Sequence, residues 1–150
     1  MTTRQAGFTL VELLVVLVLI AIGSAVVSLS LRDPSAMRLE QEGARLAALL
    51  ESARAEARAS GLAVRWLPRA EREGTSGFRF IGLPPSEEMP VQWLDPEVSA
   101  EVVGAPLAVL GPEPTIGAQR IVLTLGEQRL TLATDGLGPF AVLDDNPGPP

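Results

Sequence analysis

The chain of 150 residues contains no cysteine, no histidine and no lysine. Without cysteine it forms no disulfide, offers no thiolate nucleophile and builds no cysteine-ligated metal site. The absence of histidine removes the commonest general base and the commonest ligand of transition metals. A phosphate-binding loop that ends in Lys-Ser or Lys-Thr is excluded as well, because that loop requires a lysine. The sequence therefore predicts a protein that is not an enzyme, with no catalytic residue, no cofactor and no bound metal.

Positive charge is scarce in the C-terminal part of the chain. Residues 1–60 carry six arginines and six acidic residues, whereas residues 61–150 carry six arginines against twelve acidic residues. The second part therefore accounts for the whole formal net charge of -6. A protein that binds nucleic acid needs a basic surface to neutralise phosphates. The sequence predicts no nucleic-acid partner.

Charged residues are absent from a long segment near the N-terminus. None occurs from Leu13 to Leu31, and the part from Leu13 to Ile22 is apolar without interruption. As a helix, residues 8–31 are long enough to cross a hydrocarbon core of about 30 Å. We therefore expect a membrane-spanning helix over residues 8–31.

A cleaved secretory signal is the alternative interpretation of this segment. Such a signal has a short apolar region preceded by basic residues, but only Arg4 precedes this longer run, and Ser24-Ala25 is a weak cleavage site. Glu12 also lies within the run, and a carboxylate inside a membrane helix costs about 2.5–3.5 kcal/mol on insertion scales. Glu12 therefore needs either access to the membrane interface or a partner.

The residues around Glu12 resemble the type III signal of type IV pilins and pseudopilins. Gly7 is followed by Phe8-Thr9-Leu10-Val11-Glu12 and then by the apolar run. The resemblance implies that a dedicated prepilin peptidase cuts between Gly7 and Phe8, so that residues 1–7 are a leader peptide. It also implies that Phe8 becomes the N-methylated terminus, and that Glu12 occupies the glutamate position of the family.

Glu12 lies four residues after Phe8, and this spacing places both residues on one face of a helix. We expect its carboxylate to neutralise the positive Phe8 amine of a neighbouring subunit, because a paired charge is tolerable where an isolated one is not. Such a pair sets the register between subunits in assembly. A carboxylate that reaches the membrane interface from the helix end is the alternative interpretation.

A second helix is expected over residues 35–60, after Arg32-Asp33-Pro34 interrupts the first, because proline disfavours helical geometry before it. Its apolar residues recur at spacings of three and four and form one stripe that we expect to pack on a sheet. The stripe consists of Leu39, Gly43, Leu46, Leu50, Ala53 and Ala57. The arginine–glutamate pairs on the other face are expected to be solvated. They are Arg38–Glu42, Glu42–Arg45 and Glu51–Arg54.

Short strands are predicted after Gly61, so that residues 61–143 form a β-rich head. The clearest pair, residues 120–125 and 128–134, is joined by Gly126-Glu127, which suits a two-residue hairpin turn. Weaker strands are predicted over residues 62–67, 77–82, 91–94, 98–103 and 140–143. Prolines make residues 83–119 rich in loops, and residues 144–150 are expected to form a flexible tail. The aromatic residues expected in the core are Trp66, Phe78, Phe80 and Trp93.

This α+β layout resembles the pilin fold, in which residues 8–31 form the transmembrane half of a long helix and residues 32–60 cover an antiparallel sheet. The head resembles minor pseudopilins of the H class (GspH), which share their fold with minor pilins related to FimT and FimU. The resemblance implies a structural subunit of the type II secretion pseudopilus tip, anchored by one helix in the bacterial inner membrane with its head in the periplasm. A minor type IV pilin that acts in pilus assembly, adhesion or DNA uptake is the alternative.

The same resemblance implies a set of partners. They are the prepilin peptidase, which is also the N-methyltransferase, other minor and major pseudopilins, the inner-membrane assembly platform and exoprotein cargo. Two acidic groups have other interpretations. Asp144, Asp145 and Asn146 offer oxygen ligands to calcium, but they lack an ordered ligand spacing, and we expect a solvated tail instead. Glu87-Glu88 is expected to be a solvated pair rather than a catalytic one.

Overall fold

The computed structural model describes residues 9–30, 34–68, 76–85 and 88–143. The chain forms two compact units, Met1–Asp33 and Pro34–Pro150. Each is considered by itself. The predicted leader, the predicted interruption at Arg32-Asp33 and the predicted tail of residues 144–150 lie outside the described residues.

The described residues of the first unit form helix α1, which spans Leu10–Ser30. Leucine is a strong helix former, and the run lacks proline, so that helical propensity and apolar character agree. The side chains of α1 are described as far as Ser24, and all of them are exposed. When only the described residues are considered, no helix is both long enough and apolar enough to cross a membrane.

The second unit begins with helix α2, Pro34–Ser60. Pro34 stands at the first helical position, where its missing amide hydrogen costs no helical bond. Gly61 follows the helix with a φ of 70°, the left-handed conformation that commonly ends a helix. All six residues of the predicted apolar stripe are buried. The sequence therefore predicted both the extent of α2 and the face that it buries.

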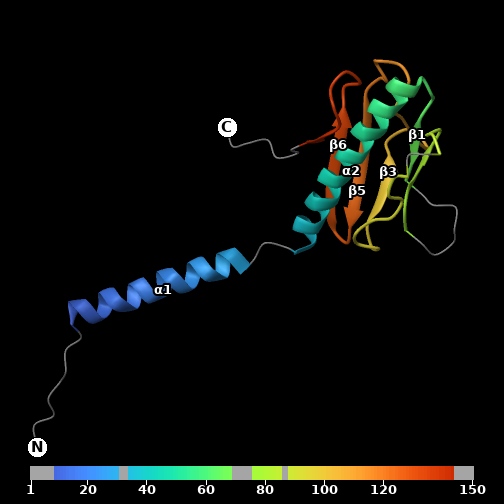
Figure 1. Cartoon of the computed structure of the whole chain (residues 1–150). Helices are drawn as coiled ribbons and strands as arrows, with labels where there is room; N and C mark the ends of the chain where they lie inside the picture. The colour runs from blue at the N-terminus through green and yellow to red at the C-terminus, as the bar shows by residue number, and fades with distance from the viewer. Residues whose placement is uncertain (1–8, 31–33, 69–75, 86–87, 144–150) are drawn as a thin grey trace, which may run out of the picture. The chain divides into compact units, whose positions relative to one another are not determined.

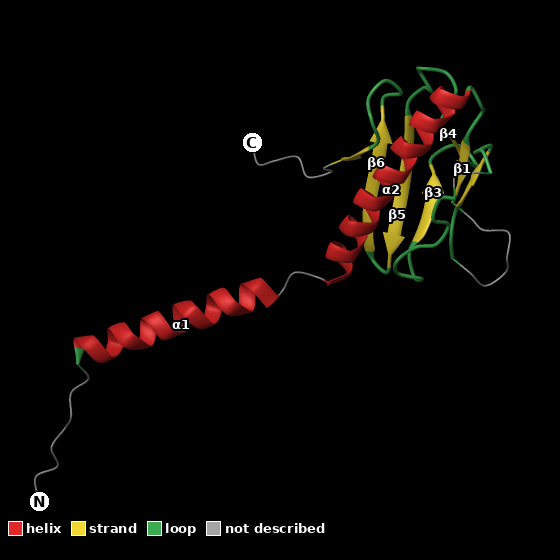
Figure 2. Cartoon of the chain, viewed as in Figure 1, coloured by secondary structure: helices red, strands yellow, loops and turns green. Residues whose placement is uncertain are grey.

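Two antiparallel sheets follow α2 (Figure 2). In the smaller sheet β1 lies between β2 and β4, and in the larger one the strand order is β3-β5-β6-β7. The strands of the smaller sheet are β1 (Arg65–Leu67), β2 (Arg79–Ile81) and β4 (Ala108–Val109). Those of the larger sheet are β3 (Ser99–Val102), β5 (Gln119–Leu125), β6 (Gln128–Thr134) and β7 (Ala141–Leu143). The predicted central hairpin is confirmed, since Leu125 pairs with Gln128 across the turn.

Helix α2 covers one face of the larger sheet, along β5 and β6 (Figure 1). The alternate residues Ile121, Leu123 and Leu125 of β5 are buried, and so is Leu132 of β6. This alternation is typical of a strand with one face in the core. Gly43 lies so close to the Leu130 side chain that an added Cβ would overlap it. The predicted packing of the stripe on the sheet is therefore confirmed.

An aromatic cluster completes the core next to the smaller sheet. The Phe78 ring centroid lies 4.6 Å from that of Trp93, 5.9 Å from that of Trp66 and 6.0 Å from that of Phe80. Trp66 and Phe78 are fully buried, and Phe80 packs against the core while partly exposed. The prediction that these four residues belong to the core is confirmed.

One predicted strand is wrong, and one observed strand was missed. Residues 91–94 do not form a strand, and Gln92 makes only an isolated antiparallel bridge with Gly77. Flanking Pro90 and Pro96 leave too short a segment for a ladder. Conversely, β4 lies in the proline-rich part that was predicted as loops. Only two residues long, it forms because β1 offers a free edge to Ala108 and Val109.

Candidate functional site

Thr9 caps the N-terminus of α1. Its backbone carbonyl accepts hydrogen bonds from the amides of Glu12 at 3.1 Å and Leu13 at 3.2 Å. Its hydroxyl oxygen also accepts from the Glu12 amide, at 3.3 Å. A threonine in this position satisfies an amide that has no partner within the helix. Thr9 followed three residues later by Glu12 is the pattern of a capping box, so this cap was readable in the sequence but was not identified.

Glu12 is exposed in the first turn of α1. A carboxylate in this place interacts favourably with the partial positive charge of the helix N-terminus. Among the ion pairs of the described residues, none involves Glu12. Gly7 and Phe8, the predicted processing site, lie outside the described residues. The pairing of Glu12 with the Phe8 amine of a neighbour stays a prediction.

The apolar side chains of α1 that the structure describes, up to Ile22, are unusually exposed for a folded chain. Leu10, Leu19 and Leu17 are exposed to 79%, 63% and 59% respectively. A contiguous apolar surface of this kind marks a site of contact with a membrane or with other protein chains. The described part of α1 therefore offers an apolar surface for contact with a membrane or with other protein chains.

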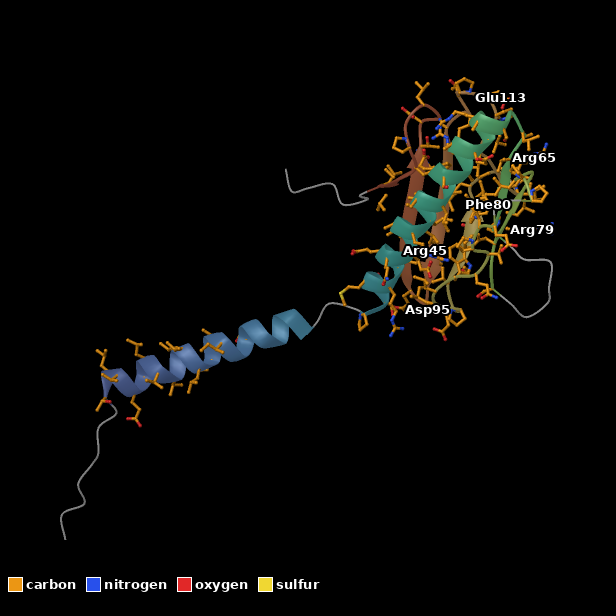
Figure 3. The ribbon with its side chains drawn as sticks, viewed as in Figure 1. Arg45, Arg65, Arg79, Phe80, Asp95 and Glu113 are labelled. Carbon is orange, nitrogen blue, oxygen red and sulfur yellow. The ribbon has the colours of Figure 1, made fainter. Side chains whose placement is uncertain are left out.

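Glu42 joins the first half of α2 to the loop before β3. Its carboxylate accepts hydrogen bonds from the amides of Leu94 and Asp95, the second at 3.2 Å. Arg45 contacts the same carboxylate at 3.4 Å and donates to the Gln92 carbonyl at 3.1 Å. We call this group the Glu42 clamp, and Figure 3 labels Arg45 and Asp95 beside α2. Only 1% of Glu42 is exposed, so its charge is held by specific partners.

Arg54 joins the second half of α2 to the turn between β6 and β7. Its guanidinium donates to the Gly138 carbonyl at 2.8 Å and the Gly136 carbonyl at 3.4 Å, and it contacts Glu51 at 3.1 Å. Glu51 in turn accepts from the Phe140 amide at 3.1 Å. We call this group the Arg54 clamp. Arg54 is only 2% exposed, so the clamp is part of the core.

These two clamps correct the prediction that the charged face of α2 is solvated. The predicted contacts Glu42–Arg45 and Glu51–Arg54 are present. Arg38 instead pairs with Asp95, at 3.4 Å. Glu42 and Arg54 are buried because their partners come from loops 50 to 85 residues away, which a helical pattern does not reveal.

The turn held by the Arg54 clamp is also fixed from within. The Asp135 carboxylate accepts from the Gly138 amide at 2.7 Å and from the Leu137 amide at 2.9 Å. These hydrogen bonds, that of Gly138 first, lower the pKa of Asp135 below its ordinary value, because they favour the charged form. The Thr134 hydroxyl adds a bond to the Gly138 carbonyl at 2.7 Å.

The lowered pKa of Asp135 predicts that the head loses stability in acid. Because its pKa is lowered in the folded chain, its stabilising effect is complete above the unfolded value of about 3.9 and is lost as pH falls through the folded pKa. We expect the melting temperature of the wild type to fall more steeply between about pH 4 and pH 2 than that of Asp135→Asn. Melts followed by tryptophan fluorescence, with exposed Glu127→Gln as the control, measure this difference. Equal slopes for the wild type and Asp135→Asn would contradict the prediction.

The remaining surface of the head carries shallow hollows. One of about 490 Å³ lies beside Trp93 and the exposed face of β3 and β5. Glu88 is exposed, whereas Glu87 lies outside the described residues, as do Asp144, Asp145 and Asn146. Within the described ranges no three acidic side chains gather closely enough to hold a metal ion.

Comparisons with known proteins address both units. Residues 2–28 match the prokaryotic N-terminal methylation motif. The chain is similar in structure to the type IV minor pilin FimU of Pseudomonas aeruginosa strain PAO1, with a TM-score of 0.53 and 14% sequence identity. That similarity covers 70% of this chain and 87% of FimU. The comparison with curated protein sequences finds no match.

The chain therefore combines a prepilin-type methylation motif with a pilin fold. The motif spans Gly7, Phe8 and Glu12, for which the sequence predicts roles in processing and assembly, and also Thr9. Such a motif implies a membrane-anchored N-terminus, processing by a prepilin peptidase and assembly with other pilin-type subunits. The likeness to FimU, at this level of identity, establishes the fold and no more.

Proposed function

We propose that this prepilin-type chain is a minor pseudopilin of the type II secretion system, of the H class. In this role it is a structural subunit of the periplasmic pseudopilus tip, which helps to initiate the fibre and to push folded exoproteins across the outer membrane. The observation that carries the proposal is the methylation motif on a chain whose small head has α2 packed on an antiparallel sheet. The head lacks the cysteines that close the C-terminal loop in many major pilins.

The proposed mechanism begins with the removal of residues 1–7. The prepilin peptidase cuts between Gly7 and Phe8, and the same enzyme methylates the new Phe8 amine. Residues 8–31 hold the subunit in the bacterial inner membrane, with the head in the periplasm. The exposed apolar side chains of α1 support this step, because they exchange lipid contacts for contacts with neighbouring helices when the subunit enters a fibre.

Glu12 provides the register in this mechanism. Its carboxylate is exposed in the first turn of α1, with no ion-pair partner among the described residues of its own chain. It is therefore free to accept the methylated amine of Phe8 from the neighbouring subunit. Within an apolar bundle the pair is specific in geometry, because an unpaired carboxylate there is costly.

The loops of residues 83–119 are the part of the head that we assign to contacts with other pseudopilins, the assembly platform or exoprotein cargo. Val91 and Leu94 are exposed to 48% and 59% in this segment. Exposed apolar side chains in loops that a rigid scaffold positions are typical of a contact surface. The Glu42 clamp holds the residues around Leu94 against α2, which supplies that rigidity.

A minor type IV pilin is the second candidate function, because the described fold is similar to that of the minor pilin FimU. In that role the subunit acts in pilus assembly, adhesion or DNA uptake. The acidic excess of residues 61–150 disfavours direct contact with DNA. The two candidates share processing and register, and they differ in the fibre that the subunit enters.

Loss of the Glu12 carboxylate tests the proposed function. We expect Glu12→Gln to abolish secretion of exoproteins in the native host, because the variant keeps the shape of the side chain and removes its charge. Mass spectrometry of the wild-type chain should find a mature terminus at methylated Phe8. Glu40→Gln, an exposed charge removal in α2, is the matched control and should secrete normally.

Three outcomes distinguish the candidates. Correct processing with secretion lost in Glu12→Gln supports the pseudopilin. Correct processing with normal secretion but lost pilus display or DNA uptake transfers the subunit to the type IV pilus. An unprocessed terminus, or a cut near Ser24, would contradict both.

A further inference from the structure

The turn between β6 and β7 holds one leucine out into solvent. Leu137 is 73% exposed, more than any other large apolar side chain among the described residues of the second unit. Single exposed leucines are common on protein surfaces, so its exposure alone indicates no function. Leu137 is distinguished by the contacts that fix its backbone. A group that is held in place before binding loses little conformational entropy when a partner binds it.

These contacts hold the backbone on both sides of Leu137. Its amide donates to the Asp135 carboxylate at 2.9 Å. The carbonyls of Gly136 and Gly138 both accept from the buried guanidinium of Arg54. An added Cβ at Gly136 would overlap backbone atoms that pack against the turn. The turn is therefore fixed to the core, while the Leu137 side chain stays outside it.

A hollow of about 720 Å³ adjoins this turn, and Asp135 and Gly138, on either side of Leu137, line it. Two further lining residues, Val103 and Leu143, are 54% and 42% exposed. Arg120 also lines the hollow, is exposed, and forms no ion pair among the described residues.

We call Leu137, Val103, Leu143 and Arg120 the Leu137 surface. The nearby carboxylate of Asp135 is already bound by the amides of its own turn. The Leu137 surface thus combines exposed apolar side chains with one positive charge that has no counterion among the described residues.

The Leu137 surface lies at the end of the head that is remote from the point where the chain enters it (Figure 1). Arg54, which holds the turn, follows Pro34 by twenty residues, about 30 Å along α2. Subunits that enter one fibre from one membrane all point in the same direction, so their contacts are head to tail. Each head then meets its next neighbour at the end remote from Pro34.

We propose that the Leu137 surface is the docking site for the head of another subunit that carries the N-terminal methylation motif. The inference rests on the proposed function, which places the chain in a fibre. The partner that fits this surface offers an apolar recess to Leu137 and an acidic side chain to Arg120. Interfaces commonly have this anatomy, with an apolar anchor at the centre and charged groups at the rim.

The experiment places a photoreactive amino acid at Val103, within the Leu137 surface, in the full-length chain in its native host. It compares the otherwise wild-type chain with Leu137→Gln, Arg120→Glu and Leu62→Gln. Leu62→Gln is the matched control, because Leu62 is 44% exposed in the connection that follows α2. Mass spectrometry identifies the cross-linked chain and, in the same sample, the terminus at Phe8. Melts followed by tryptophan fluorescence report the stability of each variant.

We expect a cross-link to another chain with the methylation motif. Its yield should fall about tenfold in Leu137→Gln and in Arg120→Glu, a loss typical of one interface anchor. Leu62→Gln should leave the yield unchanged, and all variants should melt as the wild type does.

Several outcomes would overturn this inference alone, provided that the terminus is still methylated Phe8. They are a cross-link to an exoprotein, no cross-link, or an undiminished yield in Leu137→Gln or Arg120→Glu. A lower melting temperature of Leu137→Gln would also overturn it, because the side chain would then be part of the fold. A chain that is not cut before Phe8 would overturn the proposed function as well.

Discussion

Replacement of Arg54 by methionine is expected to destabilise the head by about 2–3 kcal/mol, because it removes a buried charged donor from its hydrogen-bond acceptors. Methionine retains most of the buried volume, so the loss arises from polar groups rather than from a cavity. The Gly136 carbonyl loses its guanidinium donor, and the Glu51 carboxylate loses its counterion. The Gly138 carbonyl keeps only its bond from Thr134.

Urea unfolding of the full chain in mild detergent measures this effect. Both tryptophans of the sequence, Trp66 and Trp93, lie in the core of the head, so their fluorescence reports its unfolding. Arg58→Met is the matched control, because Arg58 is exposed one turn further along α2. It should change the free energy of unfolding by less than about 0.5 kcal/mol. Equal losses in the two variants would show that the buried contacts of Arg54 contribute no net stability.

Gly82→Ala is expected to be at least as damaging, with a loss of more than about 3 kcal/mol, beyond the usual range for one substitution. Gly82 follows β2 with a φ of 94°, a conformation that costs an L-residue about 1–2 kcal/mol. In addition, an alanine Cβ would overlap the backbone carbonyl oxygen of Ala63. A backbone atom cannot relieve the overlap by a change of rotamer, as a side chain can. The segments before β1 and after β2 must therefore move apart.

Gly104→Ala is the matched control, because it carries the first of these terms, backbone strain, without the second, the clash. Gly104 also has a positive φ, of 76°, but no atom lies within 4 Å of the place where a Cβ would stand. We expect this control to lose only about 1–2 kcal/mol, from backbone strain. The same urea titration compares both variants, and a Gly82→Ala chain no less stable than Gly104→Ala would refute the clash.

Local patterns predicted those parts of the fold that depend on neighbours in the sequence. The three- and four-residue spacing of α2 identified its buried face, because one stripe must cover the sheet. The hairpin of β5 and β6 was predicted because Gly126-Glu127 joins two alternating segments, and Gly126 indeed has a positive φ. The short β4 was missed because its pairing with β1 spans more than 40 residues, with no strong alternation of its own.

Local patterns did not predict the two buried polar sites of α2. Glu42 and Arg54 have the spacing of solvated helical pairs, and only the return of distant loops buries them. Their loop partners are backbone amides and carbonyls, which nearly every residue possesses. The residue types of the loops therefore do not indicate that these hydrogen bonds form. Thr9 differs, because its partner, the Glu12 amide, lies only three residues away, and threonine is one of the residue types that mark a helix N-cap.

The two clamps have a mechanical consequence. Glu42 and Arg54 are twelve residues apart, about 18 Å along the axis of α2. Both make their contacts sideways from the helix, to loops that precede β3 and follow β6. A pulling force applied at Pro34 along this axis therefore acts on both clamps at the same time. It loads their contacts in shear. Several bonds then have to rupture together, so the head resists having its helix drawn out lengthwise more strongly than having it peeled away.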